Sequence, residues 1–145
     1  MDIKNKILEI LGKAHLMSLA TRDDGGLWVA DVVFIYDNDL NIYWMSDPDA
    51  RHSKAILKNN EVAGTITFST KSKEKNFGIQ FYGMANKIDG SRYDLALKHL
   101  KKRSHPEPKE SDDVLQGDSW YMLKPSKIDL IDEEHFGYDK KSLTL

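Results

Sequence analysis

The chain has 145 residues, of which 40% are hydrophobic and 30% charged, and this composition predicts one globular domain over residues 1–145. Its 21 lysines and arginines against 23 aspartates and glutamates give a formal net charge of −2, so no overall attraction to nucleic acid is expected. It contains no cysteine, which excludes disulfides and cysteine-based zinc sites and agrees with a cytoplasmic location. No apolar run approaches the roughly 20 residues that a membrane-spanning helix needs, and residues 1–11 mix charged and apolar side chains, unlike a signal peptide.

The first half of the chain predicts a helix followed by a β-meander. Apolar residues recur at helical spacing from Ile3 to Leu11, and Gly12 is expected to end this helix. Short turns rich in glycine, aspartate and asparagine then separate three apolar segments. The predicted strands are His15–Thr21, Leu27–Tyr36 and Leu40–Ser46.

The second half predicts two helices and three further strands. The first helix covers Pro48–Lys58 with Asp47 as its N-cap, and the second begins at a capping box formed by Ser91 and Asp94. The charged, proline-containing segment Lys101–Asp113 is expected to be an exposed loop. The strands are Val62–Ser69, Phe77–Ile88 and Ser119–Asp132, the last with a bend or edge position at Pro125, and no regular element is predicted in the tail.

The second predicted strand is apolar on both of its faces. Leu27, Val29 and Val33 lie on one face, and Trp28 and Val32 lie on the other. A sheet with one face in water would alternate apolar and polar residues. Six strands of this kind in so short a chain predict a barrel whose outer wall is covered by helices or by a second copy of the chain. The expected fold class is therefore mainly β with peripheral helices, a homodimeric six-stranded barrel.

A candidate anion-binding site lies where a strand passes into a helix, in the segment YWMSDPDARHSKAILKNNEVAG (residues 43–64). The first amides of a helix are free to bind an anion, and the helix dipole favours negative charge there. Arg51 and His52 fall in the first turns of the predicted helix, and Lys54 and Lys58 lie on the same face as Arg51. The same pattern is also that of an ordinary solvated helix start, and both interpretations stay open on this stretch alone.

The chain carries no motif for metal binding or nucleophilic catalysis. Its five histidines show no pairing at metal-ligand spacing, and it has no Gly-x-Ser-x-Gly elbow, phosphate-binding loop or dinucleotide fingerprint. Paired carboxylates fall in turns and in the tail, where solvation explains them. We therefore expect no metal site, name no catalytic residue, and assign any chemistry to a bound cofactor.

The order of elements and the motif ARHSKAILKNNEVA (residues 50–63) resemble the flavin-binding split-barrel superfamily, whose named member is pyridoxamine 5′-phosphate oxidase. That family reads Ser-Arg-Lys-x-x-x-Leu-x-x-x-Pro-x-Val-Ala along a helix and into the next strand. Arg51, Val62 and Ala63 match this pattern, and the segment IQFYGMANKI resembles the family's later strand around Gly83. The segment WYMLKPSKIDLID resembles its closing strand. The resemblance is nearest to a small bacterial branch of the family.

The resemblance implies a six-stranded split barrel, a homodimer, and flavin mononucleotide (FMN) bound at the dimer interface beside a small-molecule substrate. The FMN phosphate would contact Ser46, Arg51 and His52. The isoalloxazine ring would contact residues from three strands: Val29, Ala30, Asp31, Val32, Val33, Tyr43, Trp44, Met45, Ser46 and Gln80. The leading hypothesis is accordingly an FMN-binding flavoprotein with oxidoreductase activity, its substrate and electron donor undefined.

Four features depart from the family pattern. Ala50 stands where serine is usual, His52 stands where lysine is usual and is cationic only when protonated, and Gly64 stands where a larger apolar residue is common. The arginine- and histidine-containing C-terminal motif by which pyridoxamine 5′-phosphate oxidases hold their substrate is absent. That reaction is therefore not expected of this chain.

Three alternatives remain beside the FMN oxidoreductase. The same barrel could hold flavin or haem for storage or sensing, with His135 as an axial ligand of the haem. A deazaflavin could take the place of FMN. A degenerate barrel could have kept its dimer and lost its ligand, as the departures at Ala50 and His52 allow. Nothing in the sequence indicates DNA or a membrane as a partner.

Overall fold

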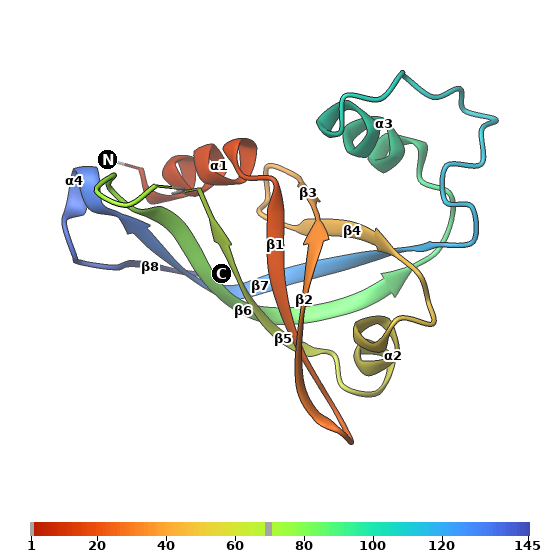
Figure 1. The fold of residues 1–145 in the computed structure, drawn as a ribbon, viewed down its shortest axis with the longest axis horizontal. Helices are drawn as coiled ribbons and strands as arrows, with labels where there is room; N and C mark the ends of the chain where they lie inside the picture. Colours follow the sequence, from red (N-terminus) through yellow and green to blue (C-terminus); the bar gives the residue numbers. More distant parts are fainter. Residues whose placement is uncertain (1, 69–70) are drawn as a thin grey trace.

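The computed structural model describes residues 2–68 and 71–145, in which one strongly bent antiparallel sheet is flanked by helices (Figure 1). Ser69, the last residue of a predicted strand, lies outside the described residues. The strands are β1 (Leu16–Asp23), β2 (Gly26–Val33), β3 (Ile35–Tyr36), β4 (Ile42–Ser46), β5 (Glu61–Thr67), β6 (Phe77–Ile88), β7 (Ser119–Asp132) and β8 (Lys141–Thr144). The helices are α1 (Ile3–Lys13), α2 (Arg51–Lys58), α3 (Tyr93–Lys102) and α4 (Glu133–Phe136).

The sheet curls so that its two ends are joined by consecutive residues. Neighbouring strands follow the order β2-β1-β5-β6-β7-β4-β3, and β8 pairs with a part of β7 that β4 does not reach. The chain passes from β2 at one end of the sheet to β3 at the other through Phe34 alone. This curled sheet is a half-open barrel, and it confirms the predicted mainly-β architecture with few helices.

The described residues form eight strands where six were predicted. All six predicted strands are present, but the fully buried Phe34 divides the segment Leu27–Tyr36 into β2 and β3. The tail after Asp132, for which no element was predicted, forms α4 and β8. Every residue of β8 is partly or fully exposed, so its sequence lacks the apolar period that marks a buried strand.

The longest pairing joins β6 to β7 and contains a bulge. Gly83 faces Pro125, and the register shifts by one residue next to this pair. The bend predicted at Pro125 is confirmed by this irregularity. β7 pairs with β4 over residues 119–123 and with β8 over residues 127–130, so the missing N–H of the proline falls between the two partners.

α1 continues past the glycine that was predicted to end it. The helix runs through Gly12 to Lys13, and it buries Ile7, Ile10 and Leu11 against the barrel. A glycine inside a helix costs about 1 kcal/mol relative to alanine, whereas each buried aliphatic side chain contributes about 1.5–3 kcal/mol. Burial of the apolar stripe therefore outweighs the local preference of Gly12.

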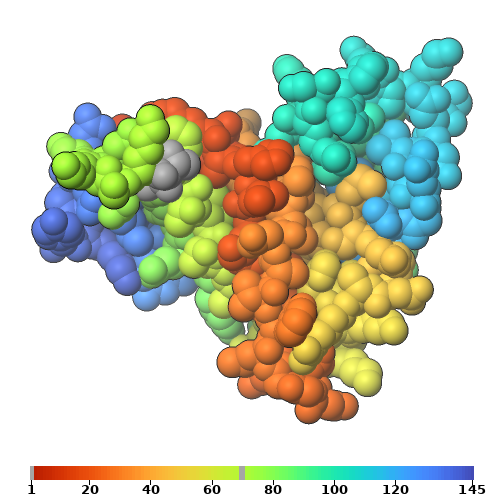
Figure 2. Space-filling model, viewed as in Figure 1, coloured from red at the N-terminus to blue at the C-terminus, as the bar shows by residue number. Residues whose placement is uncertain are grey.

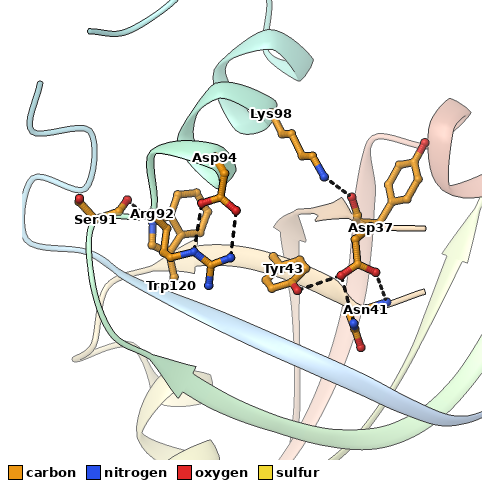
Figure 3. Close-up of polar contacts among 9 residues, drawn as sticks. Asp37, Asn41, Tyr43, Ser91, Arg92, Asp94, Lys98 and Trp120 are labelled. Carbon is orange, nitrogen blue, oxygen red and sulfur yellow. Dashed lines mark hydrogen bonds and ion pairs between the residues drawn. The ribbon is translucent and has the colours of Figure 1, made fainter. Parts of the chain in front are cut away.

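α3 begins without the predicted capping box and projects, with the loop that follows it, from one side of the barrel (Figures 1 and 2). Its N-cap is Arg92, in the left-handed region at φ 47°, and no side chain caps it. The Asp94 carboxylate instead accepts two hydrogen bonds from Arg92, each 3.0 Å long. The Ser91 carbonyl accepts a bond from Trp120 Nε1 at 2.9 Å, which ties the start of α3 to β7 (Figure 3).

The core fills the inside of the curled sheet, and α1 packs against β5, β6 and β7. Trp44, Trp120 and Tyr121 are its largest fully buried side chains. The outward side of β2 is uncovered in the single chain, since Leu27 is 78% and Val29 60% exposed. Burial of both faces of this strand was predicted, but in a single chain the face that carries Leu27 and Val29 is exposed.

Candidate cofactor site

A turn separates the end of β4 from the start of α2. Asp47 Oδ1 accepts a hydrogen bond from the Asp49 amide at 2.9 Å, which closes an Asx turn around Pro48. The prediction that the helix begins at Pro48 with Asp47 as N-cap is wrong, because the Asp47 carboxylate is used in this turn. α2 begins at Arg51, with Ala50 as N-cap and no side-chain hydrogen bond to the cap.

Ser46 and His52 meet across this turn. His52 Nε2 lies 3.0 Å from Ser46 Oγ, at hydrogen-bonding distance. Burial lowers the pKa of His52 below its ordinary value, so the imidazole is neutral near pH 7. The two side chains predicted to contact a phosphate are thus brought together, but the second positive charge is absent until an anion stabilises it.

Arg51 is held by two neighbours from the β1–β2 hairpin. Its Nε and Nη2 donate to the Asp23 carboxylate at 2.9 and 3.1 Å, and its guanidinium lies 4.5 Å from the ring centroid of Trp28. The hydrogen bond from Arg51 lowers the pKa of Asp23. A phosphate bound here would have to share the guanidinium with Asp23 or displace that carboxylate.

The first turn of α2 offers further donors. The amides of residues 51–53 have no acceptor within the described part of the chain, whereas the Lys54 amide bonds to the Ala50 carbonyl at 3.0 Å. The Ser53 hydroxyl is completely buried and likewise has no partner among the described residues. Free amides at a helix start are donors that a phosphate can use, so this turn fits the phosphate of FMN.

An open groove of about 620 Å³ lies beside these donors. Arg51, Lys54 and Lys58 line it from α2, in agreement with the shared face that their spacing predicts. Three aspartates from the hairpin and the turn line it as well, so the groove as a whole carries no excess positive charge. Selectivity for an anion must therefore come from the first-turn amides and Arg51 rather than from the overall field of the groove.

The residues predicted to face an isoalloxazine ring divide between the core and the surface. Val32, Tyr43 and Trp44 are buried. Trp44 stacks on Tyr121 with 5.8 Å between ring centroids, and neither its Nε1 nor the Tyr121 hydroxyl has a partner among the described residues. The others on these two strands are partly or fully exposed: Val29, Ala30, Asp31, Val33, Met45 and Ser46. Contact with a ring stays a prediction for all of them.

Gln80 lies in a row of residues that crosses the outer face of the sheet. The row runs from Asp31 through Ser18 and Thr65 to Gln80. Two strands separate Asp31 from Gln80, which corresponds to about 14 Å at the usual strand spacing. Asp31 accepts from Ser18 Oγ at 2.6 Å, and Gln80 Oε1 accepts from Lys140 Nζ at 3.0 Å. Gln80 and Asp31, both predicted ring contacts, therefore lie about 14 Å apart in a single chain, and contact of either with a ring stays a prediction.

Sequence reasoning missed a cavity of about 850 Å³ beneath the segment that follows α3. His99 lines it and is 4% exposed, its Nδ1 has no partner among the described residues, and burial lowers its pKa to about 4. Met45, a predicted ring contact, lines the same cavity. The predicted loop is partly anchored, since Pro108 is buried and its carbonyl accepts from the Tyr93 hydroxyl at 2.9 Å. The burial of His99 could have been predicted from its position four residues after the apolar Leu95, on the same side of α3.

Neither a group of metal ligands nor a membrane-spanning helix occurs among the described residues. Across 2–68 and 71–145, no three histidine or carboxylate side chains are grouped so that they could hold a metal ion. None of the helices in this part of the chain is long and apolar enough to cross a membrane. The hydrogen-bond donors at the start of α2 are therefore the candidate ligand site of the described residues.

No family model matches the chain, but related proteins and solved structures do. The UPF0306 protein YhbP of Escherichia coli O157:H7 is 26% identical over 146 residues, which covers 100% of this chain and 95% of the relative. A Listeria innocua structure, provisionally assigned as a pyridoxamine 5′-phosphate oxidase, superposes with a TM-score of 0.70 at 15% identity, over 90% of this chain and 98% of that one. HutZ, the heme storage protein of Vibrio cholerae, gives 0.66 at 13% identity, over 99% and 95%.

These likenesses confirm the resemblance at the level of the fold. The chain has the split-barrel fold shared by proteins of the pyridoxamine 5′-phosphate oxidase type. At 13–15% identity a structural likeness carries the architecture and not the ligand, and the two structural neighbours differ in what they are reported to do. The function must therefore be argued from the site of this chain.

Proposed function

We propose that this chain is a homodimeric FMN-binding flavoprotein that acts as an oxidoreductase on a small molecule. The observations that carry the proposal are the contact of Ser46 with His52 and the open first turn of α2, at which Arg51 begins the helix. The likeness to a protein provisionally assigned as a pyridoxamine 5′-phosphate oxidase supports it. So does the lack of any nucleophile motif, because a bound cofactor then has to supply the reactive atom.

The donors around α2 hold the phosphate in this proposal. Arg51 provides the charged hydrogen bonds, the free amides of residues 51–53 donate at the positive end of the helix dipole, and Ser46 and His52 provide further hydrogen bonds. The Asp23 carboxylate opposes binding, because it competes for the guanidinium and repels the phosphate. When bound, flavin would supply the transfer of a hydride; the chain binds and orients it and keeps water away.

The uncovered outer face of β2 supports a homodimer. By strand register Leu27 and Val29 point to the same side of the sheet as Leu16, Tyr82 and Met84. All five side chains are exposed in the single chain, by 38% to 78%. An exposed apolar face on a small domain marks an interface. A second copy of the chain would cover this face and would place its own strands beside the first copy's site, where a ring needs contacts that one chain does not gather.

An Arg51→Ala variant is expected to bind FMN at least tenfold more weakly than the unmodified chain. Loss of a charged hydrogen-bond donor to an anion costs about 1.5–3 kcal/mol, or roughly 10–150-fold in affinity. The fold should persist, because the Arg51 side chain is 37% exposed and a surface ion pair contributes little stability. The measurement is an FMN titration followed by flavin absorbance and fluorescence, on protein first dialysed free of flavin.

Arg92→Ala is the matched control for that titration. Arg92 makes the same two-bond pair, with Asp94 at 3.0 Å, and its side chain is 38% exposed. Equal losses in the two variants would indicate a general charge effect and contradict the assignment of Arg51. If the unmodified chain binds no FMN at micromolar concentration, the flavin function itself is wrong.

A second candidate function is haem binding, which one contact near the C-terminus favours. Asp132, which is 3% exposed, accepts a hydrogen bond from His135 Nδ1 at 2.9 Å, and the His135 side chain is 29% exposed. A carboxylate that holds one ring nitrogen leaves the other free and oriented, as in many metal-ligating histidines. The likeness to the heme storage protein HutZ points in the same direction.

If His135 ligates haem, addition of haemin to the unmodified chain should give a sharp Soret band that is lost in His135→Ala. His15→Ala is the control, because His15 is also an exposed histidine and lies at the other end of the chain. The two variants are compared by absorbance at matched haemin concentration. An identical spectrum from His135→Ala and the unmodified chain would remove this candidate.

A further inference from the structure

A cleft of about 740 Å³ separates α3 from the place where β2 passes into β3. Lys98, Lys101 and Lys102 line it from α3, residues 34–38 line it from the sheet, and Leu11 and Gly12 of α1 close one side. Figure 2 shows the surface hollowed between the red atoms of α1 and the teal atoms of α3. Its volume is within the range of about 300–1,000 Å³ that small-molecule sites occupy.

α3 faces the cleft with lysines because of their helical spacing. Residues three and four apart lie on one side of a helix, so Lys98, Lys101 and Lys102 share a face. Lys98 reaches from α3 toward the sheet, where its Nζ donates to the Tyr36 carbonyl at 3.3 Å (Figure 3). The bonds of Ser91 and Trp120 at the other end of α3 keep this face turned toward the break in the sheet (Figure 3).

Lys102 is the innermost of the three lysines. Its Nζ donates to the Phe34 carbonyl at 2.5 Å and lies 3.4 Å from the centroid of the Phe34 ring. The side chain is partly buried, and burial lowers the pKa of its ammonium to about 8. No carboxylate in the described part of the chain forms an ion pair with it. A partly buried cation without a countercharge is unfavourable, and an anion in the cleft would supply what is missing.

Asp37 is the one carboxylate among the described residues that line the cleft, and its oxygens are already occupied. They accept bonds from the Asn41 amide, the Asn41 side chain and the Tyr43 hydroxyl (Figure 3), and from the Asp39 amide, all at 2.9–3.0 Å. Burial opposes its ionisation, yet these hydrogen bonds hold the pKa of Asp37 below its usual value. Three ammonium groups thus face a single, committed carboxylate, in a protein whose net charge is −2.

We propose that this cleft binds a small organic anion. A carboxylate, sulfonate or phosphate group would lie against Lys102 and Lys98, and an apolar or aromatic body would lie beside the partly exposed Tyr36. The Tyr36 side chain and the methylene stems of the lysines give the cleft apolar surface, which favours a ligand with a hydrophobic part over a bare inorganic ion. The cleft shares no lining residue with the α2 groove, so the proposal stands or fails separately from the FMN function.

The binding test uses 8-anilinonaphthalene-1-sulfonate, an aromatic sulfonate whose fluorescence reports binding. Lys102→Met, which removes the charge and keeps the length of the side chain, is expected to weaken binding about tenfold or more. Lys102→Arg should recover most of the affinity, and Lys87→Met, at an exposed lysine of β6, should match the unmodified chain. Equal affinities for Lys102→Met and Lys87→Met would overturn the proposal.

A second readout follows the Lys102 ammonium itself. Reductive ¹³C-methylation of the lysines gives each a methyl signal whose shift with pH yields its pKa by NMR. Addition of the aromatic sulfonate is expected to raise the pKa of Lys102 from about 8 toward that of a solvated lysine, because an anion stabilises the charged form. Inorganic phosphate should do so only at higher concentration. An unmoved Lys102 titration in the presence of the sulfonate, or equal potency of phosphate, would contradict an organic-anion site.

Discussion

A Val29→Asp variant is expected to dissociate the proposed homodimer, so that it sediments as a single chain at concentrations where we expect the unmodified protein to be a dimer. Val29 is 60% exposed in the single chain, so the new carboxylate stays in water when the chain is alone. In the dimer the carboxylate would be buried without a partner, at a cost of about 3 kcal/mol or more. A loss of that size raises the dissociation constant roughly a hundredfold. Sedimentation velocity over a wide range of protein concentration measures the change.

Val29→Thr is the control, because threonine keeps the branched shape of valine and adds no charge. We expect it to weaken the dimer much less than the aspartate does. Circular dichroism of both variants checks that the barrel is intact, so that a monomer is not mistaken for an unfolded chain. A Val29→Asp protein that remains a dimer would show that the outer face of β2 is not the interface. If the flavin site lies between two subunits, the Val29→Asp variant should also bind FMN more weakly, because it no longer forms the dimer.

A Gly83→Ala variant is expected to lose about 3 kcal/mol of unfolding free energy, the upper end for overpacking by one methyl group. A Cβ at position 83 would collide with the Lys124 carbonyl oxygen and lie 2.8 Å from Pro125 Cα. Both are backbone atoms of β7 at the bulge, so no side chain can rotate to make room. β6 and β7 would have to separate at the centre of the longest pairing in the sheet. Urea denaturation gives the free energy directly.

Gly12→Ala makes the same chemical exchange where it should be tolerated. A Cβ there meets the end of the Tyr36 side chain, its hydroxyl oxygen, at 3.0 Å, and that group can shift. Alanine is favoured over glycine by about 1 kcal/mol inside a helix. The expected result is no loss, or a small gain, in the free energy of unfolding. Comparable losses at positions 12 and 83 would mean that the collision at the bulge is not the cause.

Strand positions were predictable where the pattern is local. The alternation of apolar residues and the turn chemistry locate all six expected strands, and β6 and β7 have the predicted bounds. The division at Phe34 could not be seen, because the largely apolar segment Leu27–Tyr36 does not reveal that its last two residues pair at the other end of the curled sheet. β8 was missed for a related reason, since its stability comes from pairing with β7 rather than from its own apolar period.

The predicted helix starts were displaced where a potential capping residue forms a different hydrogen bond in the structure. Asp47 and Ser91 have the chemistry of capping residues, but Asp47 closes an Asx turn and the Ser91 carbonyl binds an indole. A capping pattern in the sequence therefore locates a helix start only within a few residues. The family resemblance assigned Ser46 and His52 to one phosphate site, and the structure brings the two side chains together. The hydrogen bonds of Arg51 to Asp23 were not predicted, since 28 residues separate these two residues.

The structure explains why glycine stands at position 64, where the chain departs from the family pattern. The family resemblance marks this position as one where a larger apolar residue is common. In this chain a Cβ there would lie 2.6 Å from the Phe81 ring, and β1 approaches from the other side at the Ser18 carbonyl. The glycine therefore makes room for a phenylalanine on the neighbouring strand. The sequence identifies the unusual residue, and the strand pairing explains it.

The contact of Arg51 with Asp23 and Trp28 has a consequence for the entropy of ligand binding. A free arginine side chain loses up to about 2 kcal/mol of rotamer freedom when it is fixed on a ligand. Here the guanidinium is immobilised by the folded hairpin before any ligand arrives, so that loss belongs to folding instead of binding. A phosphate that binds here would replace the Asp23 carboxylate on the ordered Arg51 guanidinium. Its affinity would therefore depend on how much more strongly the guanidinium binds the phosphate than the carboxylate.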